Sequence, residues 1–198
     1  MTAISPLLTF PHISWWASVA AMDKVIFDQG EHFEKMTGRN RYRISGANNA
    51  ILLSVPLING RNQHVAMKDV QIHNESKWQV QHWRTLVSVY RRAPYFDHYE
   101  PELQQLFTTP CNRLADFNMA GIIWIQRQIG LKFKIEETTD YIKDYGTGFT
   151  DLRHKENNSL SMPRYYQVFE DRAGFVPDLS ILDLLFSEGP FSADKLKI

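Results

Sequence analysis

The first part of the chain alternates short apolar runs with polar turns. Residues 4–10 form an apolar run that Pro6 interrupts, and Ser14 can cap a short helix. Residues 24–27 then include a continuous apolar run that is typical of a buried strand. A strand, a short helix and a second strand predict a βαβ unit of the Rossmann-like kind. Ligands gather at the carboxyl ends of the strands in such units.

A hairpin is the next predicted element. Residues 39–44 alternate basic with non-basic side chains, which is the period of a strand, and residues 50–57 form a second, more apolar strand. The turn between them starts at Gly46. Residues 69–73 predict one more brief strand.

Helical periodicity dominates the middle of the chain. Apolar residues from 78 to 90 recur at helical spacing, and Ser76 with Gln79 predicts a capping box at the start of this helix. Pro101 suits the first turn of a second helix. A third helix is predicted over residues 112–129, with Gly130 as the residue that ends it.

The last third is more weakly patterned. Strands are predicted at residues 133–137 and 166–169, and a short helix at 179–186, with Asp178 as its N-cap. Residues 141–164 between them predict a mobile loop or a lid. No stretch resembles a domain linker, so we expect a single α/β domain over residues 1–198. Its expected parts are the βαβ unit, a mixed sheet, a β-hairpin and packed helices.

Composition narrows the class of protein. Hydrophobic residues make up 43% of the 198, which excludes a disordered chain. Lys plus Arg and Asp plus Glu are 22 each, so the overall charge gives no case for binding nucleic acid or a membrane surface. The apolar runs are too short for a membrane span. Cys111 is the only cysteine and cannot form an internal disulfide, which favours a cytoplasmic location.

Charged residues are densest between Asp28 and Arg43. Guanidinium groups suit phosphate or carboxylate, and Arg39, Arg41 and Arg43 would share one face of a strand. The stretch therefore predicts a site for a small anionic or phosphorylated ligand. The alternative is that Asp28, Glu31, Glu34 or solvent compensates these charges.

Individual roles follow from side-chain chemistry. His32 is a candidate acid or base, and Asp28 a candidate for orienting a hydroxyl or amine. The candidate ligand-binding residues are Lys35, Arg39, Asn40, Arg41, His64 and Lys68. Asp28, Glu31 and His32 could supply three metal ligands, but their spacing matches no metal motif, so no metal site is predicted.

Other residues have competing interpretations. The turn Phe10-Pro-His-Ile-Ser-Trp-Trp16 is similar to the HIGH-type phosphate-binding turn of nucleotidylyltransferases, but also fits a plain α/β core unit. His82 is more typical of a packed histidine. Asp183 could pair with the arginine cluster. Aromatic and basic residues are interleaved around Trp83-Arg84 and in Tyr90-Arg91-Arg92, but the aromatics fall on the core face of a helix, so nucleic-acid binding is not expected.

Many of these residues together resemble the WbqC-like protein family, in its shorter form of about this length. The matching segments run nearly end to end: Asp23 with the apolar run after it, His32, Lys35, Arg39-Asn-Arg41, Gly60-Arg61, His64, Lys68-Asp69, Trp78, His82-Trp83, Tyr90, Pro94-Tyr-Phe96, Phe117-Asn118, Tyr166-Tyr-Gln-Val-Phe169, Gly174-Phe175, Pro177 and Leu179-Ser-Ile-Leu-Asp-Leu-Leu-Phe186. The chain departs from the family in two places. It lacks the extra segment that longer members carry before the C-terminal motif, and it has Pro11-His12 where the family usually has an aromatic or small residue.

The resemblance implies an association with gene clusters for cell-surface polysaccharides. It implies an enzyme of surface-polysaccharide or activated-sugar metabolism, with acyl or aminoacyl transfer to an amino sugar as a possible reaction. The ligand would be a nucleotide, a nucleotide-sugar or a sugar phosphate. The alternative is a non-catalytic module that binds an anionic metabolite or a partner protein. The sequence indicates no particular cofactor and no oligomeric state.

Overall fold

A parallel four-stranded sheet forms the base of the protein. The computed structural model describes residues 1–60, 64–153 and 164–196. The sheet has the order β5-β2-β1-β6, and every neighbouring pair is parallel. Its strands are β1 (Thr2–Ser5), β2 (Lys24–Asp28), β5 (Lys134–Thr138) and β6 (Phe149–Asp151).

The predicted βαβ unit is confirmed, because α1 (Ile13–Val19) connects the parallel strands β1 and β2. The bounds predicted for the first strand were wrong. β1 ends at Ser5, just before Pro6, which has no backbone N–H for a ladder. The apolar side chains at Leu7, Leu8 and Phe10 are buried in a connecting segment instead.

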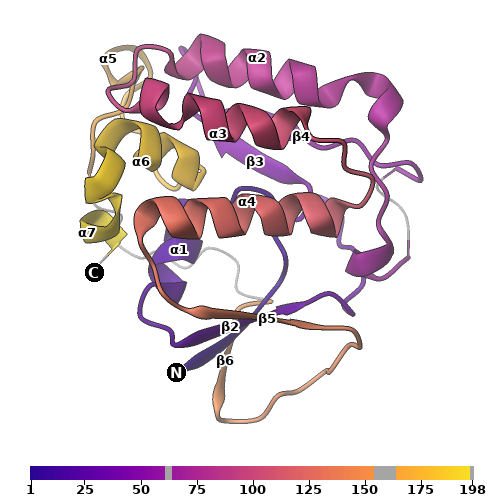
Figure 1. The fold of residues 1–198 in the computed structure, drawn as a ribbon. Helices are drawn as coiled ribbons and strands as arrows, with labels where there is room; N and C mark the ends of the chain where they lie inside the picture. The colour runs from indigo at the N-terminus through magenta and orange to yellow at the C-terminus, as the bar shows by residue number, and fades with distance from the viewer. Residues whose placement is uncertain (61–63, 154–163, 197–198) are drawn as a thin grey trace.

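Helices α1 and α4 (Leu114–Ile129) lie over one face of this sheet (Figure 1). Val25 and Phe27 alternate along β2 and are fully buried. The ring of Trp15 in α1 stacks on Phe27 at 6.1 Å, and Trp16 lies 6.3 Å from Phe133. This burial of large rings fixes α1 on the sheet.

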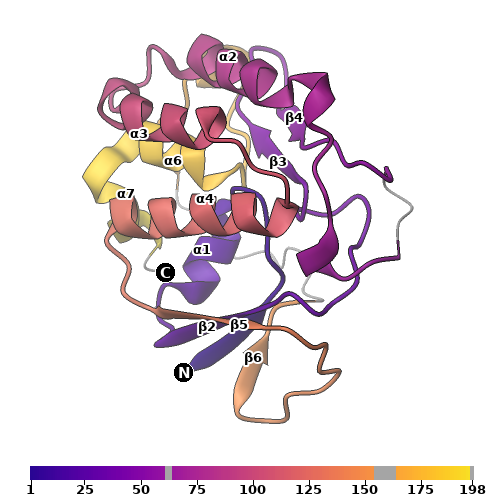
Figure 2. The same cartoon turned by 45° about the vertical axis from the view of Figure 1, so that its right-hand side comes forward.

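The predicted hairpin forms a second, separate sheet of β3 (Arg41–Ile44) and β4 (Ile51–Ser54), paired antiparallel. The hairpin lies between α4 and α2 (Trp78–Tyr90) in both views (Figures 1 and 2). Tyr42 of β3 and His82 of α2 share a hydrogen bond of 3.1 Å. The α/β class and single-domain organisation therefore hold, with the antiparallel strands outside the parallel sheet.

An aromatic cluster joins these layers. The ring of Phe10 lies 5.0 Å from Tyr42, and 5.7 Å from both Phe107 and Phe117. Phe107 belongs to α3 (Phe96–Thr108) and Phe117 to α4. The segment after β1 is thus packed between the hairpin and two helices, and this packing positions the residues that follow it.

Several predicted element ends differ from the structure. The capping box is absent, since Lys77 precedes α2 in a left-handed conformation while Ser76 and Gln79 bond elsewhere. Gly130 ends α4 with φ of 79°, as predicted. Ser180, and not Asp178, caps α6, as its Oγ accepts from the Leu182 amide at 3.3 Å.

The remaining elements are short. Residues 166–169 turn into α5 and do not form a strand, and residues 69–73 make only isolated bridges. Strand β6 falls within the segment predicted to be a loop or lid, whose residues 154–163 lie outside the described residues. The short elements that complete the described fold are η1 (Met67–Asp69), η2 (Asn74–Ser76), α5 (Glu170–Ala173), α6 (Ile181–Glu188), η3 (Gly189–Phe191) and α7 (Ser192–Leu196).

Candidate functional site

A pocket of about 270 Å³ opens between the segment after β1, the hairpin and the segment before α6. We call it the His12 pocket. Its polar lining includes His12, Arg41, Arg43, Asp178 and Ser180. Residues 8–11, residues 36–38 and Leu52 complete the lining. Residues far apart in the sequence therefore meet around one small cavity.

Backbone hydrogen bonds hold its walls together. The Ser180 amide donates to the Arg43 carbonyl at 2.7 Å, and the Ile181 amide donates to Pro11 at 3.0 Å. The Ser180 hydroxyl also donates to the Phe10 carbonyl at 2.9 Å. The segment 178–181 is thus bonded to the turn that carries His12 on one side and to β3 on the other.

Unusual backbone conformations gather at this pocket. Among the described residues, four that are not glycine have φ in the left-handed region, and three of them line the pocket: Phe10 at 40°, Met36 at 64° and Asp178 at 55°. Each such residue costs of the order of 1 kcal/mol or more, and such residues are enriched at functional sites. This clustering distinguishes the pocket from the rest of the surface.

His12 is held from one side of its ring. Its Nδ1 lies 2.7 Å from the Ser14 hydroxyl and accepts from the Trp15 amide at 3.1 Å. Asp178 Oδ2 lies 3.5 Å from the same nitrogen. Because Nδ1 is engaged by the protein, Nε2 is the ring nitrogen that is available to bind a ligand in the pocket.

Asp178 acts as the anchor of this arrangement. Its carboxylate accepts from the Ser14 amide at 2.8 Å and from the Ser14 hydroxyl at 2.9 Å. Burial raises the pKa of Asp178, but the bonds from His12 and Ser14 outweigh burial and hold that pKa below its usual value. Asp178 therefore stays ionised, with both oxygens turned to protein donors.

Arg41 and Arg43 supply the positive charge. They alternate along β3 and both line the pocket, with buried Tyr42 pointing to the other side of the hairpin. In the described part of the chain neither arginine forms an ion pair. The Nε of Arg41 is buried and has no acceptor there. An unsatisfied buried donor of this kind typically costs about 1–3 kcal/mol.

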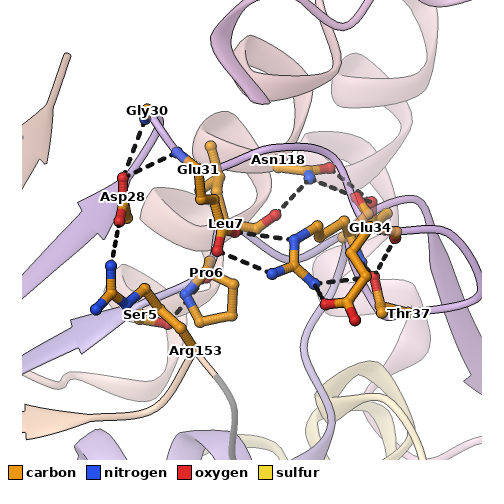
Figure 3. Close-up of polar contacts among 12 residues, drawn as sticks. Ser5, Pro6, Leu7, Asp28, Gly30, Glu31, Glu34, Thr37, Asn118 and Arg153 are labelled. Atoms are coloured by element: carbon orange, nitrogen blue, oxygen red, sulfur yellow. Dashed lines mark hydrogen bonds and ion pairs between the residues drawn. The ribbon is translucent and has the colours of Figure 1, made fainter. Parts of the chain in front are cut away.

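Arg39, predicted to share this face, lies before the strand and points elsewhere. Its side chain is buried and forms a bidentate pair with Glu31, with N–O distances of 2.9 Å for Nε and Nη2. Its Nη1 donates at 3.1 Å to Glu34 and to Thr37 (Figure 3). Burial raises the pKa of Glu31, and the bond from Arg39 opposes that rise. Compensation by Glu31 and Glu34 was the alternative interpretation, and the structure shows it for Arg39.

Two further candidates are also bonded within the protein. Asn40 is buried and donates to the Val55 carbonyl at 2.9 Å, which aligns the two strands of the hairpin. Asp28, at the carboxyl end of β2, is fully buried. It accepts from the amides of Gly30 and Glu31 at 3.1 and 3.0 Å (Figure 3). It also accepts from the Thr138 hydroxyl at 3.1 Å.

Arg153 is the residue that the sequence interpretation missed. Its guanidinium donates to Asp28 at 2.7 Å (Figure 3). It also donates to Asp151 at 2.6 Å, and its side chain is fully buried. It also lies 5.3 Å from the ring centroid of Tyr141 and 5.2 Å from that of Tyr145. The only signal was an arginine two residues after an acid in a weakly patterned segment.

The other predicted residues lie outside the His12 pocket. His32 and His64 are exposed, and the backbone of His32 pairs with Ala66. Lys68 donates to the Thr139 carbonyl at 2.8 Å, across the loop that follows β5. Lys35 is exposed and engaged in a contact of its own. Of the ligand-binding candidates, the structure thus brings only Arg41 into this pocket, and the roles of the others remain predictions.

Contacts in the structure decide the interpretations given above for His82 and Asp183. His82 is packed as predicted, and burial lowers its pKa to about 4. The suggested pairing of Asp183 with the arginines was wrong, because Asp183 accepts from the hydroxyls of Tyr90 at 2.6 Å and Tyr165 at 2.8 Å.

A metal site and a membrane-spanning helix are both absent from the described residues. There, no group of His, Cys, Asp or Glu side chains is arranged to hold a metal ion. No helix within the described ranges has the length and apolar character needed to cross a bilayer.

Comparison with known proteins gives the family. No curated protein and no solved structure matches the chain. The model of the WbqC-like protein family matches residues 8–157, which is most of the chain and includes His12, Arg41 and Arg43. The match ends before Asp178 and Ser180, so the wall that anchors His12 lies outside it. The chain belongs to the WbqC-like protein family.

Proposed function

We propose that the protein is an enzyme of surface-polysaccharide or activated-sugar metabolism, and that it binds the anionic part of its substrate in the His12 pocket. The observation that carries this proposal is the buried Nε of Arg41, which has no acceptor among the described residues. An anionic oxygen at this point would satisfy the donor, and a guanidinium can bind phosphate or carboxylate with two parallel hydrogen bonds.

The charges around the pocket support an anionic ligand. Arg41 and Arg43 contribute two positive charges, and Asp178 contributes the one acidic side chain of the lining. Both oxygens of Asp178 accept from Ser14, so they face protein donors. The hydroxyls of Thr9 and Ser180 already donate to backbone carbonyls, so the two arginines are the groups of the lining that suit a phosphoryl or carboxylate group.

His12 is the candidate acid or base in this proposal. We give it the role in place of His32, because its ring lies in the pocket and is oriented by a bonded carboxylate, while His32 is exposed. In the transfer that the family resemblance implies, the amine of an amino sugar attacks an activated acyl or aminoacyl carbon. The N–C bond forms, the bond to the leaving group breaks, and the leaving group takes the proton that the amine loses. Because Nδ1 of His12 accepts from the Trp15 amide, the neutral ring carries its hydrogen on Nε2, which donates to the departing group.

Apolar side chains at the rim of the pocket favour some of the expected ligands over others. Leu52 and Met36 line it and are 53% and 68% exposed, so both apolar side chains are open to a ligand. Leu52 is the cross-strand partner of Arg43, so an apolar surface lies next to the positive charge. This favours a nucleotide or nucleotide-sugar, whose base would cover the rim, over a bare sugar phosphate.

Equilibrium binding tests the anion site. Titration calorimetry would compare inorganic phosphate, a sugar 1-phosphate, a nucleoside diphosphate and a nucleotide-sugar, using the wild-type protein, Arg41→Met and Arg84→Met. Loss of two charge-assisted hydrogen bonds predicts at least about tenfold weaker binding in Arg41→Met. Arg84 lies on α2, away from this pocket, so its variant should bind as the wild type does. If no phosphorylated compound binds, or if Arg41→Met binds equally well, the proposal is refuted.

Turnover separates an enzyme from a binding module. With a bound nucleotide-sugar and an activated acyl donor, His12→Ala should lower kcat by about 10²–10⁴-fold and leave the dissociation constant nearly unchanged. A protein that binds these ligands but shows no turnover with any donor, in the wild type as in His12→Ala, would be the non-catalytic module.

A further inference from the structure

A second recess runs along the exposed side of α2. It has a volume of about 580 Å³ and lies between α2 and the segment of Val168 and Phe169. We call it the α2 groove. It shares no lining residue with the His12 pocket. The interleaved Trp-Arg and Tyr-Arg-Arg sequences noted above supply its cationic residues.

Helical geometry aligns these residues. Arg84, Val87, Ser88 and Arg91 are separated by three, four and seven positions, which places them along one face of the helix. At a rise of about 1.5 Å per residue, Arg84 and Arg91 lie about 10 Å apart along α2. Arg92 follows at the end of the helix and lines the same groove. The groove therefore carries a row of positive charge with an apolar residue inside it.

The arginines of the described chain separate into two groups. Five form ion pairs with carboxylates: Arg39, Arg113, Arg127, Arg153 and Arg164. Six form no ion pair with any described residue: Arg41, Arg43, Arg84, Arg91, Arg92 and Arg172. Two of these six line the His12 pocket and three line the α2 groove. Charge without an internal counterpart is thus concentrated at two places.

The helix dipole does not account for the groove. It favours cations at the carboxyl end of α2 and can explain Arg91 and Arg92, but its effect fades within the last turn. Arg84 lies six residues before the last residue of α2, Tyr90, and is exposed. Partly exposed Trp83, Val87 and Phe169 line the same recess. The surface combines unmatched cations with apolar area, which is unusual for a face that meets only water.

We infer that the α2 groove binds an acidic segment of a partner protein in an extended conformation. Side chains on one face of an extended segment recur about every 7 Å, so acids at positions 1 and 5 lie about 13 Å apart with position 3 between them. Two flexible arginines about 10 Å apart can reach both acids, and an apolar side chain at position 3 would then lie against Val87 and Phe169. A single phosphate would engage one end of this row and leave the apolar area uncovered.

A fluorescein-labelled peptide with the core Glu-Ser-Phe-Ser-Glu is a direct probe. Its anisotropy would be titrated with wild-type protein, Arg84→Ala, Arg91→Ala and the double reversal Arg84→Glu/Arg91→Glu. Exposed ion pairs predict about two- to fivefold weaker binding for each single variant and at least about tenfold for the double reversal. Lys132→Glu is the charge-reversal control, because Lys132 is exposed and lines neither recess, and this variant should bind the peptide as the wild type does. Circular dichroism would show that each variant is folded.

The chemistry of the peptide gives the second comparison. A peptide with both Glu replaced by Gln should lose most of its affinity, and a peptide with Phe replaced by Ala should bind about tenfold more weakly, since burial of an aromatic ring is lost. Equal binding of the Gln peptide, or of the double reversal, would overturn the inference. So would vesicles with 30% anionic lipid that displace the wild-type peptide, because the surface would then be a membrane contact.

Discussion

The carboxylate of Asp183 is fully buried between two tyrosine hydroxyls, and its ionisation should make the stability of the protein depend on pH. Burial raises the pKa of Asp183 from 3.8 to about 6, although the bonds from Tyr90 and Tyr165 oppose the rise. Tyr90 in turn accepts from the Ser45 amide, and Tyr165 from Gln167. The network is therefore closed within the protein.

The sign of the effect follows from proton binding. Between pH 3.8 and about 6, the folded protein retains a proton on Asp183 that the unfolded chain has released. The free energy of unfolding therefore falls as the pH rises through this window, and the loss is complete above it. A pKa difference of about two, at about 1.4 kcal/mol each, predicts a total loss of about 3 kcal/mol.

The perturbation that tests this is Asp183→Asn, which cannot ionise. Urea denaturation of both proteins, followed by circular dichroism at intervals from pH 4 to 7.5, gives the free energy of unfolding at each pH. The wild-type value minus the variant value should fall by about 2 kcal/mol across the range, because Asp183 in the unfolded chain is already more than half ionised at pH 4. Glu31, whose pKa burial also raises, is present in both proteins and cancels from this difference. A difference that stays constant within about 1 kcal/mol would refute the reasoning.

Three further predictions concern contacts within the fold. Arg39→Ala leaves the carboxylate of Glu31 buried without its partner and should lower the free energy of unfolding by about 3–5 kcal/mol in urea, whereas a loss below 1 kcal/mol would mean that Glu31 finds water. Arg153→Ala leaves the carboxylate of Asp28 buried without its partner and should lower the free energy of unfolding at pH 7 by a similar amount. An unchanged midpoint of urea denaturation would contradict the importance of that pair. Gly189→Ala should lower Tm by several degrees in differential scanning calorimetry, because φ is 56° and the new Cβ would lie 2.5 Å from an aromatic ring. A Tm equal to that of the wild type would show that the backbone can relax there.

The local pattern of apolar and polar residues was sufficient to predict several helices and strands. The apolar run of β2, the alternation along β3 and the helical period of α4 each predicted an element that the structure contains. Gly130 was predictable for the same reason, since a residue with φ of 79° at a helix end favours glycine. Pairing of β5 and β6 with the parallel sheet was not predictable in this way, because strand order depends on contacts between distant segments.

The site depended on one strand boundary and one contact between residues far apart in the sequence. β3 begins at Arg41 and not at Arg39, so Arg39 lies in a turn and reaches Glu31 instead of the face shared by Arg41 and Arg43. Asp178 meets His12 from 166 positions away, and no spacing in the sequence indicates that contact. The alternating arginines showed where positive charge lies, but only the fold shows which arginine remains unpaired.

Charge balance explains why, along the carboxyl edge of the parallel sheet, the candidate site lies by the segment that follows β1 and not by the end of β2. Parallel α/β sheets commonly bind ligands at that edge, and Asp28 is placed there at the end of β2. Here Arg153 neutralises Asp28, while Arg39 neutralises Glu31 nearby, and all four side chains are buried. A buried pair whose partners satisfy each other has little to offer an incoming anion, because binding would first have to break it. Arg41 and Arg43 have no such partner among the described residues, so the positive charge that is unbalanced near this edge, and with it the electrostatic attraction for a substrate, lies at the His12 pocket.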